Sequence, residues 1–299
     1  MGFTERDIPS QQGRTFVISG ANSGIGLQAT DLLTSAGARV VMACRSTHKG
    51  ETARATVAHP DRVEVRSLDL ADLSSVRAFV DALVEDHPRV DVLVNNAGVM
   101  ALPYGRTVDG FERQIGTNHL GHFALGARLF RALDAHPERV VTVASQAHRW
   151  GRIRLHDLHR ERGYHPWLAY GQSKLANLLF MRELGRRAPG VISAACHPGY
   201  ASTNLQGAAA RETGSSAGKA FWRWANGTVA QSARDGALCT VYAAVGDDVQ
   251  TGDYIGPRGP FEMAGPPCKV SMTRRARDDE AARALWELSE ELTNERFEP

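Results

Sequence analysis

The stretch "VISGANSGIGLQA", residues 17–29, decides the fold. It ends a short apolar run with three glycines, Gly20, Gly24 and Gly26, and then continues as a helical pattern. A turn from a buried strand into a helix directs unpaired backbone N–H groups outward at the positive end of the helix dipole. Such a turn is an anion site, because it binds a negative group without needing side chains.

Each glycine has a separate task in this interpretation. Gly20 makes the tight turn, Gly24 lets a pyrophosphate approach the backbone, and Gly26 lets the helix pack closely on the sheet. Glycines at this spacing could also form a plain turn, but their place between a predicted strand and a helix favours phosphate binding. The residues that we expect to line this site are Gly20, Asn22, Ser23, Gly24, Ile25 and Gly26.

The composition is that of an ordinary globular protein. The 299 residues, 42% of them hydrophobic, are enough for one large core. A formal net charge of +2 gives no electrostatic reason to expect a nucleic acid or a membrane as partner. No apolar run approaches the ~18 residues of a membrane span. The N-terminal residues do not resemble a secretory signal, and the four cysteines form no disulfide or zinc pattern, so we expect a cytoplasmic protein.

Short β-branched runs alternate with longer amphipathic segments. The predicted strands are residues 15–19, 39–43, 63–67, 90–94, 139–144 and 191–196, and the predicted helices lie near 25–36, 48–58, 73–86, 111–134 and 170–188. Repeated strand–helix–strand units favour a parallel sheet with helices on both faces. We therefore predict an α/β protein, a Rossmann-type doubly wound parallel sheet in three αβα layers, and a single domain over residues 1–299.

Two segments interrupt this alternation. Residues 146–169 are rich in His and Arg without periodicity, and residues 200–227 are rich in Gly, Ser and Ala. Both follow predicted strands at the sheet edge where ligands bind in open α/β folds, so we expect a substrate-side loop and a lid. The aromatic and apolar residues in and beside the second segment are Tyr200, Leu205, Phe221, Trp222 and Trp224. They could form an apolar binding wall, or serve as core or interface residues.

The glycine spacing, Gly-x-x-x-Gly-x-Gly, resembles the TGxxxGxG motif of the short-chain dehydrogenase/reductase family, with Ser19 in place of the usual Thr. Other motifs of that family follow in order: "LDL" (68–70), "NNAG" (95–98), Asn118, Ser145, "YGQSK" (170–174) and "HPG" (197–199). The resemblance covers essentially the whole chain. The segments "ACRS" (43–46), "NHLGHF" (118–123) and "AYGQSKLANLLF" (169–180) are similar to the branch that contains retinol dehydrogenases, the WW-domain oxidoreductase and protochlorophyllide reductases.

The resemblance implies four catalytic residues, Asn118, Ser145, Tyr170 and Lys174. Tyr170 and Lys174 are four residues apart and share one face of a helix. The lysine cation and a positive nicotinamide ring would lower the pKa of the phenol from about 10, making Tyr170 the general acid in reduction and general base in oxidation. Ser145 would hydrogen-bond the substrate oxygen. Asn118 would support a water relay to Lys174, which would also bind the nicotinamide ribose.

The resemblance also implies contacts to a dinucleotide cofactor. They are Asp69 and Leu70 at the adenine, Asn96, Ala97 and Gly98 after the fourth strand, and Pro198, Gly199 and Thr203 near the nicotinamide, with Tyr170 and Lys174 shared. Other assignments stay open for some of these positions. Asp69 or Thr203 could cap a helix, and the segment around Asn96 could be a plain turn.

The residues after the second strand predict which dinucleotide is used. Proteins that choose NAD usually place an acidic residue about 20 residues beyond the glycine turn, where it binds the ribose 2′-hydroxyl. This chain has Arg45 and Ser46 there and no acidic residue between 44 and 47. The guanidinium could bind a 2′-phosphate, alone or with Ser46, although it could also be a solvated Arg. We therefore expect NADP(H) to be preferred over NAD(H).

Together these features predict an NADP(H)-dependent oxidoreductase that interconverts a carbonyl and an alcohol on a fairly lipophilic small molecule. A catalytically silent NADP-binding sensor or interaction module is the alternative, and we would expect such a module to lack the Ser, the Tyr or the Lys. The pairs His119/His122 and His156/His159 lack further ligands at recognisable spacing, so we expect no metal site. We expect no nucleic-acid partner and no membrane span, and leave a homo-oligomer open.

Overall fold

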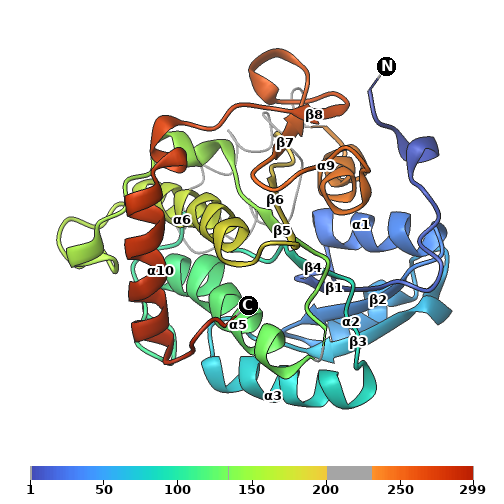
Figure 1. The fold of residues 1–299 in the computed structure, drawn as a ribbon, viewed down its shortest axis with the longest axis horizontal. Coiled ribbons are helices and arrows are strands. Elements are labelled where there is room, and N and C mark those ends of the chain that lie inside the picture. Colours follow the sequence, from blue (N-terminus) through green and yellow to red (C-terminus); the bar gives the residue numbers. More distant parts are fainter. Residues whose placement is uncertain (1, 134, 201–230, 299) are drawn as a thin grey trace, which may run out of the picture.

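The computed structural model describes residues 2–133, 135–200 and 231–298. One eight-stranded sheet runs through them in the order β3-β2-β1-β4-β5-β6-β7-β8 (Figure 1). The strands are β1 (Thr15–Ser19), β2 (Arg39–Cys44), β3 (Val63–Ser67), β4 (Val92–Asn95), β5 (Arg139–Val143), β6 (Ile192–Cys196), β7 (Tyr254–Pro257) and β8 (Pro267–Lys269). The pairs from β3 to β7 are parallel, and β7 and β8 are antiparallel. The strand order reverses between β1 and β4, where open α/β sheets bind ligands.

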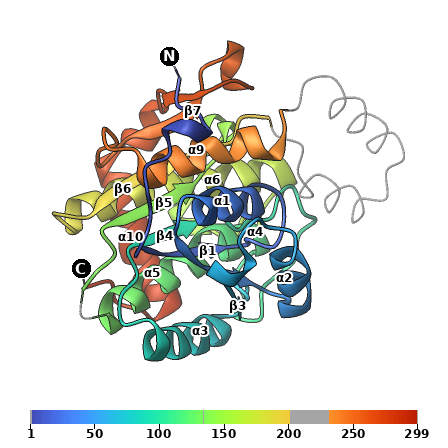
Figure 2. The same ribbon diagram turned by 90° about the vertical axis from the view of Figure 1, so that its right-hand side faces the viewer.

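Helices cover both faces of this sheet. On one face, α1 (Gly24–Ser35) packs beside α9 (Ala233–Val245), and both cross the front of Figure 2. On the other face lie α3 (Leu73–Asp86), α5 (Gly121–Ala132) and α6 (Pro166–Arg187), with α10 (Asp279–Thr293) packed outside α6. The short α2 (Thr47–Arg54) packs on β3 at the sheet edge. The predicted doubly wound sheet in three αβα layers is therefore confirmed.

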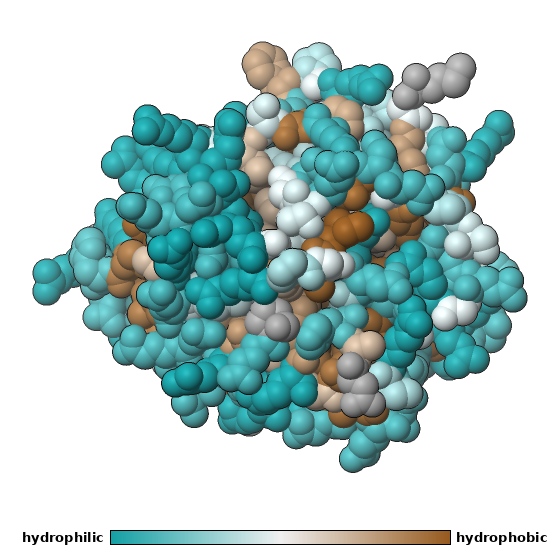
Figure 3. All heavy atoms as spheres, in the orientation of Figure 1, coloured by the Kyte–Doolittle hydropathy of each residue, from teal (hydrophilic) through white to brown (hydrophobic). Residues whose placement is uncertain are grey.

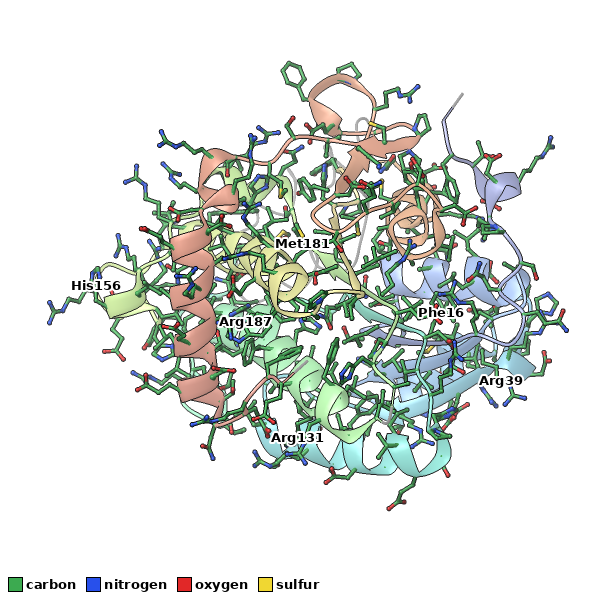
Figure 4. All side chains as sticks on the ribbon, in the orientation of Figure 1. Phe16, Arg39, Arg131, His156, Met181 and Arg187 are labelled. Carbon is green, nitrogen blue, oxygen red and sulfur yellow. The ribbon has the colours of Figure 1, made fainter. Side chains whose placement is uncertain are left out.

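Burial on both faces explains why the central strands have continuous apolar sequences, whereas the edge strand β3 is only partly buried and carries charged residues. In β1, Phe16 and Ile18 belong to the cluster with α1 and α9, whereas Val17 belongs to the cluster with α3 and α5. All three side chains are fully buried. Phe16 is labelled in Figure 4 at the α1 side of the sheet.

The predicted helix 111–134 is interrupted. Its first part is a short helix, α4 (Arg113–Ile115), followed by a π-helical turn, η3 (Gly116–Leu120), and only then by α5. The Glu112 side chain caps α4 by accepting hydrogen bonds from Gln114 N (3.0 Å) and Ile115 N (2.9 Å). The apolar pattern continues through all three pieces, so it could not indicate the extra residue that a π turn accommodates.

The predicted loop 146–169 is shorter than expected. The helix α6 begins at Pro166, which suits the first turn because proline has no N–H to leave unpaired. The remaining loop contains two 3-10 turns, η4 (Gln146–Arg149) and η5 (Leu155–Asp157). The lid predicted over 200–227, including Thr203, Leu205, Phe221, Trp222 and Trp224, lies outside the described residues except for Tyr200.

The last third of the chain contributes more to the sheet than expected. The strands β7 and β8 were not predicted, because they have four and three residues and contain Gly256, Pro257 and Pro267, which weaken a strand pattern. They form an antiparallel edge on an otherwise parallel sheet. The connecting turns include η6 (Pro260–Glu262) between β7 and β8 and η7 (Arg274–Arg277) before α10, while η1 (Glu5–Asp7) and η2 (Pro60–Arg62) lie earlier in the chain.

Hydrophilic side chains cover most of the face that Figure 3 displays, and apolar residues show there only in small patches. Among the described residues, none of the helices combines the length and the apolar character needed to cross a membrane.

Candidate active site

The three glycines of residues 17–29 allow a turn that packs very closely on its neighbours. Gly20 and Gly24 have φ angles of +65° and +56°, which residues with side chains rarely adopt. A Cβ on Gly26 would lie 2.6 Å from Asn96 Nδ2 and 2.8 Å from Gly20 O. The glycines therefore bring the turn after β1 against the segment after β4, which leaves the N-terminus of α1 open toward a ligand.

Ser19 fastens these two segments together. Its Oγ accepts hydrogen bonds from Asn96 N and Ala97 N, both 3.0 Å long, and lies 2.7 Å from His122 Nε2. The Asn96 amide in turn donates to Ser19 O at 2.7 Å. His122 Nδ1 contacts the backbone oxygen of Asn118 at 3.0 Å. One serine thus joins the glycine turn, the "NNAG" segment and the helix that carries Asn118, a connection that the sequence pattern does not reveal.

A cavity of about 880 Å³ opens at the carboxyl ends of β1, β4, β5 and β6. The predicted site residues that line it are Gly20, Asn22, Ser23, Gly24, Ile25, Gly26, Asn96, Ala97, Gly98, Ser145, Tyr170, Lys174, Pro198 and Gly199. The fold therefore brings the glycine turn and three of the four catalytic candidates to one place.

The start of α6 and the end of β5 position the reactive side chains. Tyr170 and Lys174 lie one turn apart on α6, and Lys174 Nζ is 5.8 Å from the centre of the Tyr170 ring. Lys174 Nζ donates to Val143 O in β5 at 2.9 Å. Ser145 follows β5, caps η4 by accepting from Ala147 N (3.2 Å), and lies close enough to the Tyr170 phenol to lower the pKa of that phenol. Serine, phenol and ammonium thus meet at the cavity wall.

Burial has the largest effect on the pKa of Tyr170 in the protein without a cofactor. Burial raises the pKa of the phenol to about 12, and the hydrogen bond with Ser145 lowers it only in part. Burial also lowers the pKa of Lys174 to about 8. Charged neighbours can be read from the sequence, but burial cannot. Burial removes both groups from water and so disfavours the charged form of each. The predicted lowering of the Tyr170 pKa depends on the lysine cation together with a bound nicotinamide, so it stays a prediction, and the protein without cofactor shows the burial that this lowering must overcome.

Asn118 lies in the π turn η3 directly behind the cavity and is fully buried. Its Oδ1 accepts from Val99 N at 2.7 Å, and its Nδ2 donates to Val99 O at 2.9 Å and to Ser173 Oγ at 2.8 Å. A Cβ on Gly98 would lie 3.2 Å from Asn118 Oδ1 and 3.4 Å from Lys174 Nζ. Asn118 therefore holds the cavity wall at Val99 close to Lys174, and its role in a water relay stays a prediction.

Four predicted cofactor residues do not line the cavity. Arg45 is exposed just beyond β2 and makes no hydrogen bond or ion pair with a described residue. Ser46 Oγ caps α2 by accepting from Lys49 N at 3.4 Å. Asp69 Oδ1 accepts from Ala71 N at 3.0 Å, while the cap of α3 is Asp72. Leu70 is buried, and its carbonyl oxygen fills the space where a Cβ on Gly121 would lie.

Several cavity residues were not predicted as site residues. The apolar ones include Val99, Met100, Trp150, Trp167, Phe261 and Met263, and the polar ones include Gln146, Arg149 and Glu262. Those from the loop after β5 lie in the segment already predicted to face the substrate, so the signal was present without identifying single residues. The residues around Phe261 belong to an irregular turn that no sequence pattern indicates.

The histidine pairs have other partners. His119 Nε2 is 2.9 Å from Ser289 Oγ, and burial lowers the pKa of His119 to about 3 and that of His122 to about 4. His159 Nδ1 accepts from Glu112 N at 3.3 Å, while His156 points outward at the edge of the molecule in Figure 4. Across the described parts of the chain, no group of three or more His, Cys, Asp or Glu side chains is arranged to bind a metal.

Comparisons with known proteins agree with this geometry. The short chain dehydrogenase family model matches residues 14–214. Human retinol dehydrogenase 12 is 40% identical over 295 residues, which cover 96% of this chain and 88% of that protein. A solved structure from Mycobacterium paratuberculosis has 49% identity and a TM-score of 0.82, with 99% of each chain covered. A Beutenbergia cavernae protein described as an NAD(P)-dependent gluconate 5-dehydrogenase, solved with bound NADP, has 26% identity and a TM-score of 0.59 over 79% of this chain and 91% of that chain.

The predicted resemblance to retinol dehydrogenases is confirmed by these matches. The family match covers the glycine turn, the segment after β4 and all four catalytic candidates, and the retinol dehydrogenase relative extends the similarity over nearly the whole chain. The chain therefore belongs to the short-chain dehydrogenase family and is an oxidoreductase acting on CH–OH groups, in a family that uses an NAD(P) cofactor.

Proposed function

We propose that this enzyme prefers NADP(H) and interconverts a carbonyl and an alcohol on a fairly lipophilic small molecule. The observation that carries the proposal is the single cavity in which Ser145, Tyr170 and Lys174 meet the glycine turn. A silent NADP-binding sensor would have no use for that combination, so we favour turnover.

The cradle fits a dinucleotide. The turn between β1 and α1 exposes backbone N–H groups, and the positive φ angles of Gly20 and Gly24 keep this surface free of side chains. The Lys174 ammonium has three N–H donors and uses one of them for its hydrogen bond to Val143 O. Another would donate to a ribose hydroxyl of the cofactor beside Gly98. A nicotinamide bound at this end of the cavity would supply or accept the hydride.

The side chains of this protein would manage the proton. With a pKa near 12, Tyr170 is a neutral phenol at pH 7 and is ready to donate its proton to the oxygen of a substrate that is being reduced. Ser145 would hydrogen-bond the same oxygen and stabilise its developing negative charge. In the oxidation direction, Tyr170 would act as a base, and for this it needs positive charge nearby, from Lys174 and from the oxidised cofactor.

The cavity wall favours an apolar substrate. Trp150, Trp167, Phe261 and Met263 line it together with Tyr200, and its volume lies within the usual range of small-molecule sites. The wall thus combines side chains from the loop after β5, the start of α6 and the turn after β7. Retinol dehydrogenase 12 carries the name of a lipophilic alcohol as its substrate, which supports the same choice here.

Arg45 supports the choice of NADP. The parallel register pairs Ser19 with Ala43, so Arg45 leaves β2 beside the glycine turn that follows β1. Its guanidinium has no partner among the described residues, so it could bind a 2′-phosphate by donating hydrogen bonds to it. We expect this contact to raise the affinity for NADP(H) over NAD(H) by about ten- to a hundred-fold, which is the contribution of a charge-assisted hydrogen bond.

The test compares kcat/KM with NADPH and with NADH on a panel of lipophilic ketones and aldehydes. Wild type should prefer NADPH, Arg45→Asp should weaken or reverse that preference, and Arg39→Asp should leave it unchanged. Arg39 is a matched control, because it is an exposed Arg at the opposite end of β2. Equal use of both dinucleotides by the wild type would rule out phosphate recognition by Arg45.

A further inference from the structure

A polar cluster interrupts the apolar wall of the cavity next to Ser145. It consists of Gln146, Arg149 and Glu262, which all line the cavity, with His197 buried behind them. Glu262 Oε2 accepts from the Gln146 amide and lies 3.1 Å from His197 Nε2, and Glu262 Oε1 accepts from Arg149 Nη2 at 3.2 Å. Arg149 Nε donates to Gln146 Oε1. The chemistry derived so far for Tyr170, Ser145 and Lys174 uses none of these groups.

The turn that carries Glu262 is held in an unfavourable backbone conformation. Phe261 and Glu262 have φ angles of +54° and +55°, although neither is glycine. Residues with side chains rarely adopt this conformation, and those that do persist where the surroundings force them, commonly at functional sites. Here, Tyr200 N donates to Met263 O at 2.8 Å, and a Cβ on Gly199 would lie 2.4 Å from that oxygen. The turn is therefore clamped against the "HPG" segment, with Glu262 facing the cavity.

The protonation states of the cluster follow from its hydrogen bonds. His197 Nδ1 accepts from Gly199 N at 3.2 Å, so the proton of the neutral ring lies on Nε2 and is donated to Glu262. This hydrogen bond, and the nearby Arg149, lower the pKa of Glu262, while burial lowers the pKa of His197. At neutral pH the cluster therefore contains one carboxylate, one guanidinium and a neutral imidazole.

One edge of the guanidinium is left for a ligand. Arg149 uses Nε and Nη2 within the cluster, and its Nη1 makes no hydrogen bond or ion pair with any described residue. We propose, as an extension of the proposed function, that Arg149 is a specificity residue whose Nη1 binds a second, uncharged oxygen acceptor of the substrate, such as an ester or amide carbonyl. The preferred substrates are then apolar molecules with two oxygen functions, one reduced at Ser145 and Tyr170 and one bound at Arg149.

The charge of the cluster decides between an uncharged acceptor and a carboxylate. Glu262 is ionised and forms an ion pair with the same guanidinium. Its negative charge therefore offsets the positive charge of Arg149 and repels the carboxylate of a substrate. A carbonyl oxygen gains the charged hydrogen bond without that repulsion. The cluster should therefore rank a keto ester above both the matching keto acid and the matching plain ketone.

The first experiment measures kcat/KM for a plain ketone and for keto esters of equal chain length, in which the distance between the two carbonyls grows by one methylene at a time. At the best spacing, wild type should prefer the ester by about ten- to a hundred-fold, the value of a hydrogen bond to a charged donor. In Arg149→Met this ratio should fall toward one. Arg152→Met should keep the ratio, because Arg152 is an exposed Arg of the same loop that does not line the cavity.

The second experiment reverses the charge argument. Glu262→Gln keeps the size of the side chain but removes the negative charge, so the ratio of keto acid to keto ester turnover should rise about ten-fold over wild type. Thermal unfolding of each variant checks that the fold is retained. Turnover of plain ketone and keto ester at equal rates by wild type, at every spacing, would overturn the role of Arg149 and leave the proposed function standing. Absence of turnover of every carbonyl with either dinucleotide would overturn both.

Discussion

At the scale of single residues, Tyr170 is the group whose removal should separate chemistry from binding. Its phenol lies in the cavity wall beside Ser145, and Tyr170→Phe removes the transferable proton with almost no change of volume. Loss of one positioned acid typically slows a reaction by ~10²–10⁴. We expect kcat to fall by that factor while the Kd for NADP, measured by fluorescence titration, stays within about two-fold. A kcat close to that of wild type would exclude the proposed acid.

Lys174 makes cofactor binding depend on pH. Burial lowers its pKa to about 8, so the side chain is an ammonium below that pH and increasingly a neutral amine above it. The protonated fraction falls about ten-fold for each further pH unit, and with it the charged contact to the ribose. NADP should therefore bind to wild type more weakly at pH 9.5 than at pH 7. Lys174→Met should bind weakly at both, and a parallel pH response of the two proteins would contradict the ribose contact.

At the scale of elements, strand β5 fixes the end of helix α9 through Arg139. This side chain is buried, and its Nη1 donates to Ala243 O at 2.9 Å and to Gly246 O at 3.1 Å. Arg139→Met leaves those carbonyls without their donor, which costs about 1–3 kcal/mol of unfolding free energy. Arg39→Met is the matched control, because Arg39 also begins a strand but is exposed at the rim of the sheet (Figure 4).

Urea unfolding of the two variants measures this difference. The midpoint should fall for Arg139→Met and stay near that of wild type for Arg39→Met, with an unchanged slope. Equal midpoints in the two variants would show that the end of α9 does not depend on Arg139.

The elements also show which parts of the fold and of the site could be predicted from the sequence. All six predicted strands exist, and five of them are apolar because they are buried along nearly their whole length. The exception is β3, which was also expected to be buried on both faces but lies at the edge of the sheet and is only partly buried. The cavity brings together 14 of the predicted site residues, since the motif positions follow directly from the ends of those strands. Phe261 and Glu262 could not be predicted, because their positions depend on a clamped turn with positive φ angles rather than on any periodic pattern. Desolvation of Tyr170 was missed for a similar reason, since burial is a property of the packed fold.

At the scale of the whole molecule, the cavity depends on segments from most of the chain. Ser19, Asn96, Asn118 and His122 form one hydrogen-bonded path across β1, the segment after β4, the π turn and α5. The last residues support the opposite side of α5, where Phe297 packs against Phe123 and Trp286 with ring centres 5.7 and 4.8 Å apart. The single domain over residues 1–299 and the cytoplasmic location stay predictions.

Buried histidines spread through this framework should make the whole fold sensitive to acid. Burial lowers the pKa to about 3 for His119 and to about 4 for His122 and His148, against about 6.5 in an unfolded chain. Below pH 6.5 these histidines bind protons in the unfolded chain but stay neutral in the native state. Their contribution to the unfolding free energy is therefore complete above pH 6.5 and is lost as the pH falls toward 4 and 3. At pH 5 each such histidine lowers the free energy of unfolding by about 2 kcal/mol relative to its value at neutral pH.

His119→Gln isolates one of these contributions, because glutamine does not titrate and can still reach the Ser289 hydroxyl that His119 contacts. The loss of unfolding free energy between pH 7.5 and pH 5, measured with urea, should shrink by about 2 kcal/mol relative to wild type. His156→Gln should leave that loss unchanged, because His156 is exposed at the edge of the molecule rather than buried. Carboxylates titrate alike in all three proteins, so an equal loss in each would mean that His119 is not held neutral by burial.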